Sequence, residues 1–203
     1  MIFVSLLKNY SKELLHIEGL RLLQIADGNE NCTENIETGK NGKPFFKDRH
    51  AEFNISHSNR AAALIYNTSK KSSGGAVLST GIDIQKINYK KDITGIMEKA
   101  YSANEIEYIK NAPDVIEKQK RFYRVWVLKE AAIKLNSLSV FDIKEIPSFI
   151  DDDGLLCAAQ TMHFDYLIKM FESADETYML AAAIESATGQ SKLLQQDIVF
   201  SGQ

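Results

Sequence analysis

The sequence predicts an α+β protein made of two similar halves, each with a long helix packed on a small antiparallel sheet. Apolar residues recur at helical spacing over residues 5–26 and again over 117–136, and short alternating apolar runs flank or follow both segments. A helix followed by strands therefore occurs twice. A polar connector suggests a division near residue 76, giving halves 1–76 and 77–203.

Local signals predict the elements of the first half. Leucine and isoleucine residues at three- and four-residue spacings predict one helix over 5–26. The alternating runs 53–58 and 61–66 predict two strands, and the turn residues Ser58-Asn59-Arg60 between them predict a hairpin.

The second half is expected to begin with a strand over 77–87. Ser102-Ala-Asn-Glu105 has the spacing of a capping box and predicts a helix that runs to Lys110. The longest helix is expected over 117–136. The strands expected after it are 146–150, 155–159, 164–170 and 178–184, with a turn at Asp151-Asp-Asp-Gly154 between the first two.

Composition indicates a soluble globular protein, since 44% of the 203 residues are hydrophobic and 25% are charged. With 24 basic and 27 acidic residues, the net charge of -3 gives no overall field for binding nucleic acid or an anionic membrane. A secretory leader and a membrane-spanning run are not expected, which predicts a cytoplasmic location. Cys32 and Cys157 stand far apart without a CxxC motif, so neither a zinc site nor a disulfide framework is expected.

A magnesium site is the first chemical feature that the sequence suggests. Residues two apart on a strand share a face, so Asp83 and Gln85 are expected to project together with oxygen atoms available. Glu130, on the long helix, would supply a second carboxylate, and Mg²⁺ is commonly held by one or two carboxylates plus substrate phosphates. The alternative is a solvated Asp83 and an ordinary surface pair between Glu130 and Lys134, four residues apart.

A phosphate-binding segment is the second feature. Ser56 and His57 are adjacent on a strand, so they point to opposite faces, and a Ser/His hydrolase is not expected. Their O–H and N–H groups are suited to phosphate oxygens at different points of an extended ligand, although a structural histidine is the alternative. Gly42-Lys43-Pro44 would add a cation on a rigid turn, or an unremarkable exposed lysine. Together with the acidic strand, these groups suit a magnesium-bound pyrophosphate.

Four segments, in order, resemble the 4′-phosphopantetheinyl transferases, specifically the larger pseudo-dimeric type that activates surfactin synthetase. The matching segments are Gly42-Lys43-Pro44-Phe45, Phe53-Asn54-Ile55-Ser56-His57-Ser58, Gly81-Ile82-Asp83-Ile84 and Trp126-Val-Leu-Lys129-Glu130-Ala-Ala-Ile-Lys134. The resemblance implies the 4′-phosphopantetheinyl transferase fold. It also implies transfer of 4′-phosphopantetheine from coenzyme A to a serine of an apo acyl or peptidyl carrier protein, with Mg²⁺ as cofactor and adenosine 3′,5′-bisphosphate as the second product.

The resemblance implies a role for each matching residue. Asp83, Glu130 and Lys134 would be catalytic: Asp83 and Glu130 would bind Mg²⁺, Glu130 would also deprotonate the acceptor serine, and Lys134 would contact the transferred phosphate. The residues implied to bind coenzyme A are Lys134 with Lys129 beside it, Ser56 and His57 at the 3′-phosphate, Lys43 and Pro44 beside the adenine, and Lys12 near the 3′-phosphate.

The sequence departs from the family pattern at three places. Gln85 stands where an acid is usual, so the third metal ligand is expected to be neutral or replaced by water. Lys12 stands where an arginine is usual, and a segment that precedes it in longer members is expected to be missing. Glu105 matches a family acid, but the capping box already accounts for it.

Two rival functions remain open from the sequence. One is a degenerate family member that binds coenzyme A without transferring anything, which Gln85 makes conceivable. The other is a non-catalytic module that uses the same fold to bind an acidic carrier-protein helix. The resemblance further implies a monomer, because both halves lie in one chain.

Overall fold

The computed structural model describes residues 1–7, 11–71, 76–146, 148–150, 156–158, 164–173, 176–186 and 198–200. The helices in this part of the chain are α1 (Lys12–Asp27), α2 (Thr94–Ala100), α3 (Ala103–Lys110) and α4 (Val115–Asn136), with 3₁₀ turns at Cys32–Asn35, Lys40–Gly42 and Val140–Glu145. None of these helices has the length and apolar composition needed to cross a membrane.

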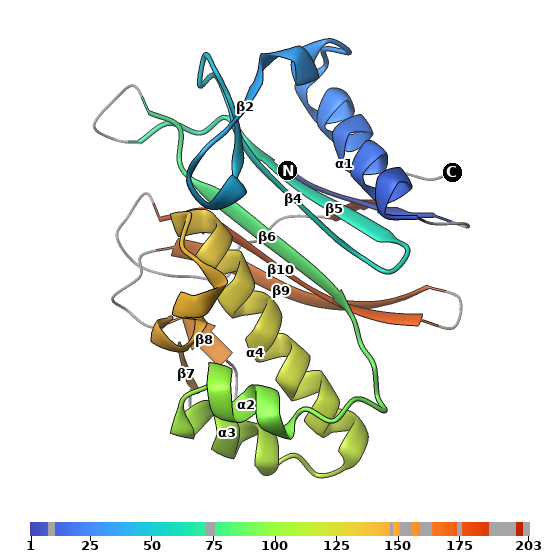
Figure 1. Ribbon diagram of the computed structural model, residues 1–203, viewed down its shortest axis with the longest axis vertical. Helices are drawn as coiled ribbons and strands as arrows, with labels where there is room; N and C mark the ends of the chain where they lie inside the picture. Colours follow the sequence, from blue (N-terminus) through green and yellow to red (C-terminus); the bar gives the residue numbers. More distant parts are fainter. Residues whose placement is uncertain are drawn as a thin grey trace.

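The described strands form two main sheets. The first has the order β11 (Ile198–Phe200), β1 (Ile2–Leu6), β5 (Ala61–Asn67), β4 (Glu52–Ser58), and the second has the order β6 (Thr80–Lys86), β10 (Glu176–Glu185), β9 (Phe164–Ser173). Two small hairpins pair β2 (Ile36–Thr38) with β3 (Pro44–Phe46) and β7 (Ser148–Ile150) with β8 (Leu156–Ala158). Helix α1 packs on the first sheet and α4 on the second (Figure 1). This arrangement is the predicted α+β fold.

Alternating side chains of the strands build three apolar cores. Leu64 of β5 faces α1, whereas its neighbour Ile65 faces the second sheet. In β10, Ala181 faces α4 and Leu180 faces the first sheet. Each sheet is therefore apolar on both faces: one face packs on its own helix and the other on the other sheet, which fixes the two halves against each other.

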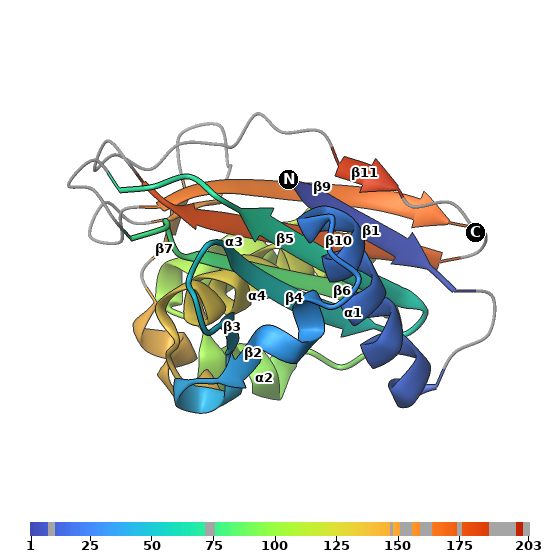
Figure 2. The ribbon, with the colours of Figure 1, turned by 90° about the horizontal axis from the view of Figure 1, so that it is seen from above.

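The expected helix over 5–26 is wrong at its start, because Ile2–Leu6 is a strand. It pairs with β5 on one side and with β11 on the other, and β11 lies beside it in Figure 2. The helix begins only at Lys12, after Ser11, whose hydroxyl accepts the N–H of Leu14 as an N-cap. Leucine spacing alone did not reveal this boundary.

Most other elements are confirmed. The 53–66 hairpin, the capped helix that ends at Lys110, the long helix and both long C-terminal strands are present. The elements α2, β2, β3 and β11 were not predicted from the sequence. The predicted turn at 151–154 lies outside the described residues. The division near residue 76 stays a prediction, and β11 adds to the first sheet although it falls in the predicted second half.

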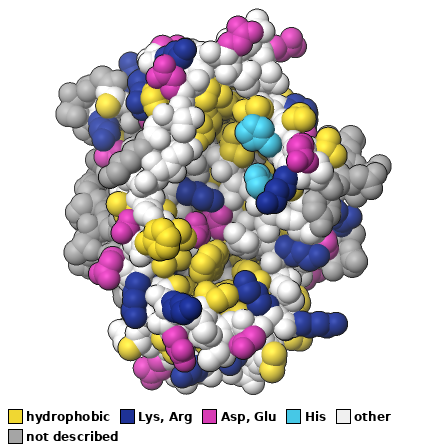
Figure 3. All heavy atoms as spheres, viewed as in Figure 1, with side chains coloured by type: hydrophobic (Ala, Val, Ile, Leu, Met, Phe, Trp, Pro, Cys, Tyr) yellow, Lys and Arg dark blue, Asp and Glu magenta, His cyan; other side chains and the backbone are white. Residues whose placement is uncertain are grey.

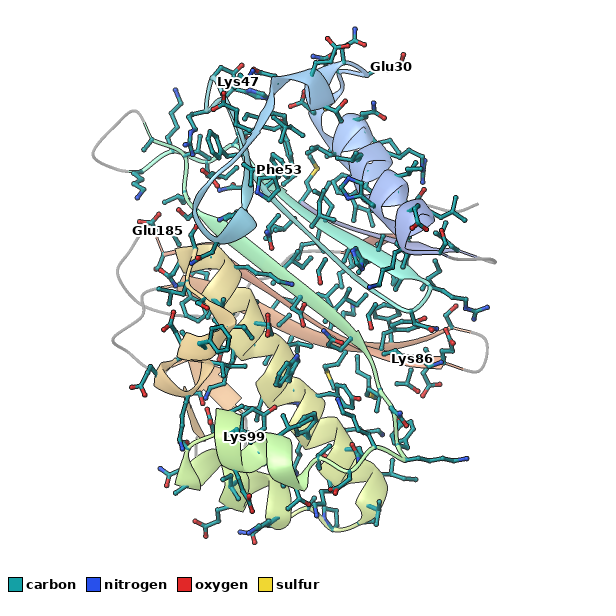
Figure 4. All side chains as sticks on the ribbon, in the orientation of Figure 1. Glu30, Lys47, Phe53, Lys86, Lys99 and Glu185 are labelled. Atoms are coloured by element: carbon teal, nitrogen blue, oxygen red, sulfur yellow. The ribbon has the colours of Figure 1, made fainter. Side chains whose placement is uncertain are left out.

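One half-buried carboxylate, that of Glu176, ties the two sheets together at the far end of β6. Glu176 accepts hydrogen bonds from Asn59 Nδ2 at 2.6 Å, Arg60 Nε at 3.1 Å and Lys86 Nζ at 2.6 Å, and also from the hydroxyl of Tyr178. Figure 4 shows Lys86 at this end of the molecule. Burial alone would raise the pKa of Glu176, but the donors, Lys86 first, lower it to about 2.

The absence of a side chain at Gly81 lets α4 cross β6 at close range. A Cβ atom there would overlap with the carbonyl oxygen of Ala131 and would lie 2.5 Å from the backbone nitrogen of Leu135. Both atoms belong to the helix backbone, which cannot turn aside as a side chain can. Gly81 therefore sets how near the last turns of α4 come to β6 and to Asp83.

We expect Gly81→Ala to destabilise the protein by about 1–3 kcal/mol, because the added methyl group must push α4 away from β6. Gly95→Ala is the matched control, since a Cβ at Gly95 meets nothing within 4 Å. Alanine is the better helix former, so the control should be neutral or more stable by up to about 1 kcal/mol. Urea unfolding of both variants measures the difference. Equal stabilities would show that the close approach is not a constraint.

Candidate functional site

A polar seam joins β4 to β6, the strands at which the two sheets meet. No backbone ladder pairs these strands in the described structure; instead, every second residue of β4 directs a side-chain oxygen at a backbone N–H of β6. The three hydrogen bonds join Ile82 N to Asn54 Oδ1 (2.9 Å), Ile84 N to Ser56 Oγ (3.3 Å) and Lys86 N to Ser58 Oγ (3.0 Å). These side-chain oxygens accept the buried N–H groups of β6 in place of the backbone carbonyl groups of a neighbouring strand.

Asp83 lies at the centre of the seam and is only 2% exposed. Its Oδ1 accepts hydrogen bonds from Ser56 Oγ at 2.8 Å and from Lys134 Nζ at 2.6 Å, and its Oδ2 accepts one from Gln85 Nε2 at 3.1 Å. Asp83 and Gln85 share a face, as predicted. The alternative of a solvated Asp83 is wrong, because strand β4 and helix α4 cover it.

Glu130 precedes Lys134 by one turn of α4, but the two do not form the expected surface pair. Lys134 binds Asp83 and Ser56 instead. Among the described residues, no hydrogen bond or ion pair reaches the Glu130 carboxylate. Burial and then the negative charge of Asp83 raise the pKa of Glu130, while the positive charge of Lys134 opposes them.

The carboxylates of Asp83 and Glu130 suit a divalent cation whose remaining coordination positions are filled by oxygens of a bound ligand or of water. A cation between Asp83 and Glu130 would remove the like-charge repulsion that raises the pKa of Glu130. The described residues hold no group of three or more His, Cys, Asp or Glu side chains suited to a metal. Two carboxylates match Mg²⁺, which usually takes few protein ligands and several phosphate or water oxygens. Gln85 turns its Nε2, and not its oxygen, toward Asp83.

A cavity of about 470 Å³ opens beside Lys134, between the halves. Its lining comes from the loop Asn41–Pro44, from Asn54 and Ile55 of β4, from Ile133 and Lys134 of α4, and from Ser137–Val140. Figure 3 shows basic and acidic side chains side by side in the depression between the two halves. The volume lies within the usual range for small-molecule sites.

Pro44 and Lys43 both line this cavity, as their predicted place beside a ligand requires. The ammonium of Lys43, however, is turned toward the protein. It donates to the carbonyl oxygens of Thr80 at 2.8 Å and Leu135 at 3.4 Å, and burial lowers its pKa. Lys43 therefore ties the loop to β6 and α4, and only its apolar stem is offered to the cavity.

A basic cluster lies on the other face of β4. His57 is exposed and points away from Ser56, as predicted. Burial of part of its ring lowers the pKa of His57, and the positive charges of Lys134, His16 and Lys12 lower it further. Figure 3 shows histidine side chains beside lysine or arginine on this face. Lys12, His16 and His57 thus form a basic cluster on this face, and such a cluster suits an anion.

His16 was missed by the sequence reasoning. It stands four residues after Lys12 on α1, so the two share a helix face. That spacing was the available signal, because residues 12 and 16 both fall inside the predicted helix 5–26.

Lys129 lies on the opposite side of α4 from the seam, and the prediction that it binds coenzyme A is not supported. It is 0% exposed, and its ammonium lies 2.8 Å from Glu105 Oε2 and 3.2 Å from the carbonyl oxygen of Ala100. Glu105 also completes the capping box with Ser102. Both charged residues are thus used to hold α2 and α3 against α4.

A second, smaller cavity of about 130 Å³ adjoins the site on its other side. Its lining residues are Gln85, Lys91, Ile96, Phe122, Tyr123 and Trp126. Trp126 is half-buried, and its ring stacks on Phe122 with 6.2 Å between centroids. Trp126, Glu130 and Lys134 follow one another at four-residue intervals on α4, so Glu130 lies between a residue of the smaller cavity and a residue of the larger one.

One family model and two relatives show which known proteins this chain is similar to. Residues 79–183 match the model of the 4′-phosphopantetheinyl transferase superfamily, which is just over half of the chain. A Haemophilus influenzae protein named as a 4′-phosphopantetheinyl transferase is 28% identical over 144 residues, covering 70% of this chain and 57% of that protein. The 4′-phosphopantetheinyl transferase HetI of Nostoc sp. is 31% identical over 109 residues, covering 52% of this chain and 42% of HetI.

The chain belongs to the 4′-phosphopantetheinyl transferase superfamily. It spans about half the length of the two relatives it matches. A solved apo-ACPS structure from Chronobacterium ammoiniagenes aligns with 54% of this chain and 97% of its own, at 15% identity and a TM-score of 0.34, which is too low to bear on the fold.

We expect Glu130→Gln to be as stable as the wild type, or more stable, at pH 7 without divalent cations. The folded pKa of Glu130 is raised, so its ionised form destabilises the metal-free fold, and this cost appears as pH rises through the raised pKa. Near pH 4 and below, glutamates are protonated in both states, so the difference should vanish. Urea midpoints at both pH values measure it.

The matched control for this variant is Glu37→Gln. It removes a carboxylate on the exposed β2–β3 hairpin, where Lys47 lies 3.9 Å away, and such surface pairs contribute little. A Glu130→Gln protein less stable than this control at pH 7 would contradict the electrostatic assignment.

Proposed function

We propose that the protein transfers 4′-phosphopantetheine from coenzyme A to a serine hydroxyl of an apo acyl or peptidyl carrier protein. The serine oxygen forms the new bond to phosphorus, the pyrophosphate P–O bond breaks, and adenosine 3′,5′-bisphosphate leaves. The observation that carries the proposal is the group of Asp83, Glu130 and Lys134 between two cavities, in a chain of this superfamily.

Asp83 and Glu130 would hold Mg²⁺, with Gln85 or a water as a further ligand, and the ion supplies positive charge for the pyrophosphate. Lys134 places a second positive charge beside the same carboxylate, 2.6 Å from Asp83 Oδ1, from where its flexible side chain reaches phosphoryl oxygens. Glu130 accepts the serine proton. Its carboxylate is able to take this proton, because none of the described residues donates a hydrogen bond to it.

Coenzyme A would occupy the larger cavity, with its adenine against Pro44 and its 3′-phosphate at the basic cluster of Lys12, His16 and His57. Carrier-protein docking is proposed at the smaller cavity. There Lys91 stands over apolar Ile96 and Trp126, which matches the basic, apolar-floored patch that an acidic carrier helix requires.

The surfactin-synthetase-activating subtype, the monomeric state and the cytoplasmic location belong to the same proposal. Two sheet-and-helix units in one chain support the pseudo-dimeric subtype. Both rival functions use the same fold without any group transfer. In the first, the protein binds coenzyme A alone, and in the second it binds a carrier protein alone.

Mass spectrometry of an apo carrier protein, incubated with this protein, coenzyme A and Mg²⁺, tests the proposal. The carrier should gain the mass of one phosphopantetheine group, and the gain should be lost with Lys134→Ala. Coenzyme A binding without transfer would favour the degenerate member. Carrier binding without any coenzyme A binding would favour the interaction module.

We expect His57→Ala to weaken coenzyme A about 10- to 100-fold and 3′-dephospho-coenzyme A much less, because a charge-assisted bond needs the phosphate to be present. The pKa of free His57 is lowered, and a bound phosphate would raise it, so binding takes up a proton. The preference for coenzyme A should therefore grow as pH falls from 8 to 6.

Calorimetric titrations of both ligands at three pH values measure this preference. In His57→Ala the preference should be small and flat with pH. A wild-type preference that does not change with pH, or equal losses for both ligands, would assign His57 a structural role.

A further inference from the structure

The Ser56 hydroxyl is turned into the seam, away from the basic cluster where the 3′-phosphate is proposed to bind. Ser56 is 6% exposed, whereas the next residue, His57, is exposed on the other face of β4. We infer that Ser56 is a positioning residue that fixes the carboxylate of Asp83 for metal binding, an inference that rests on the proposed function.

The hydrogen bonds of Ser56 leave it nothing to offer a phosphate. A hydroxyl has one proton to donate and two lone pairs to accept with. The proton goes to Asp83 Oδ1 at 2.8 Å, because a carboxylate only accepts. The lone pairs accept from the Ile84 N–H at 3.3 Å and from Lys134 Nζ at 3.1 Å. All three bonding positions are therefore filled from within the protein.

The same bonds allow Ser56 to fix the position of the Asp83 carboxylate. Its acceptor bond to Ile84 anchors the hydroxyl to the backbone of β6, the strand that carries Asp83. The other donor to Oδ1, Lys134, sits on a long side chain whose proposed task is to move to a phosphoryl oxygen. When Lys134 turns to that oxygen, Ser56 still holds Oδ1 and keeps the carboxylate from rotating.

This arrangement assigns the two neighbours on β4 to different parts of the reaction. His57 serves the ligand phosphate, and Ser56 serves the metal site. The N-terminal half thereby orients a metal-binding carboxylate that belongs to the C-terminal half, across strands that share no backbone ladder in the described structure.

Ser58 provides a matched control for Ser56. Its hydroxyl accepts the Lys86 N–H at 3.0 Å in the same seam. It donates one long bond, of 3.5 Å, to Gln85 Oε1 and makes no contact with Asp83. Ser56→Ala and Ser58→Ala each remove one hydroxyl that accepts from a β6 N–H, so both should lose stability in urea. Ser56→Ala should lose more, because its buried hydroxyl also bonds Asp83 and Lys134. Only Ser56→Ala removes the donor to the carboxylate.

The test is a titration of each metal-free protein with Mn²⁺, followed by electron paramagnetic resonance. Ser56→Ala should weaken Mn²⁺ about fivefold or more, from loss of a hydrogen bond to a charged group, and Ser58→Ala should stay within about twofold of wild type. The preference for coenzyme A over 3′-dephospho-coenzyme A, measured without metal, should be unchanged in Ser56→Ala. Should Ser56→Ala not fold, Ser56→Thr and Ser56→Val replace it as a shape-matched pair with and without the hydroxyl.

Three results overturn the inference: unchanged Mn²⁺ affinity in Ser56→Ala, equal weakening in both alanine variants, or a wild type that binds no Mn²⁺. Loss of the preference for coenzyme A over 3′-dephospho-coenzyme A in Ser56→Ala would show that Ser56 binds the 3′-phosphate instead. A wild type whose Mn²⁺ binding depends on Ser56, but which transfers nothing to any carrier protein, supports the role of Ser56 and overturns the proposed function alone.

Discussion

The polar seam between β4 and β6 is the constraint on which the site depends. Two sheets that meet edge to edge must satisfy the backbone N–H groups of the meeting strand, and Asn54, Ser56 and Ser58 do so with side-chain oxygens. Side chains reach further than a backbone ladder, so the strands stand far enough apart for Asp83 to lie between them and α4. The polar residues that join the halves therefore also create the space in which the charged groups meet.

Features with local causes could be predicted from the sequence, and features set by distant partners could not. The Ser102–Glu105 capping box and the hairpin turn at Asn59 and Arg60 are local, and both were found. The strand Ile2–Leu6 was not predicted, and its last two residues were assigned to the helix, because its conformation depends on β5 and β11. In the site, the shared face of Asp83 and Gln85 follows from strand geometry, whereas the bond from Ser56 to Asp83 joins residues 27 positions apart and needs the assembled fold.

Helix α4 shows how neighbouring residues of one motif take different tasks. Adjacent residues on a helix point about 100° apart, so Lys129 and Glu130 face different surroundings. Lys129 points at α2 and α3, where Glu105 neutralises it in the core. Glu130 faces Asp83, and burial together with the negative charge of Asp83 raises the pKa of Glu130. The buried ion pair of Lys129 and Glu105 is sensitive to loss of either partner. Adjacent residues of the motif therefore meet different requirements.

The pairing of β1 with β11 has a consequence for how the protein is made. A chain synthesised at about 5–20 residues per second leaves the outer edge of β1 open for on the order of ten seconds or more after β1 and β5 can pair, until residues 198–200 are complete. An open strand edge is a template for strands of other chains. Strand β11 is short, but it covers the outer edge of β1. A nascent chain without β11 therefore has an open strand edge through which it can associate with copies of itself, and the finished protein does not.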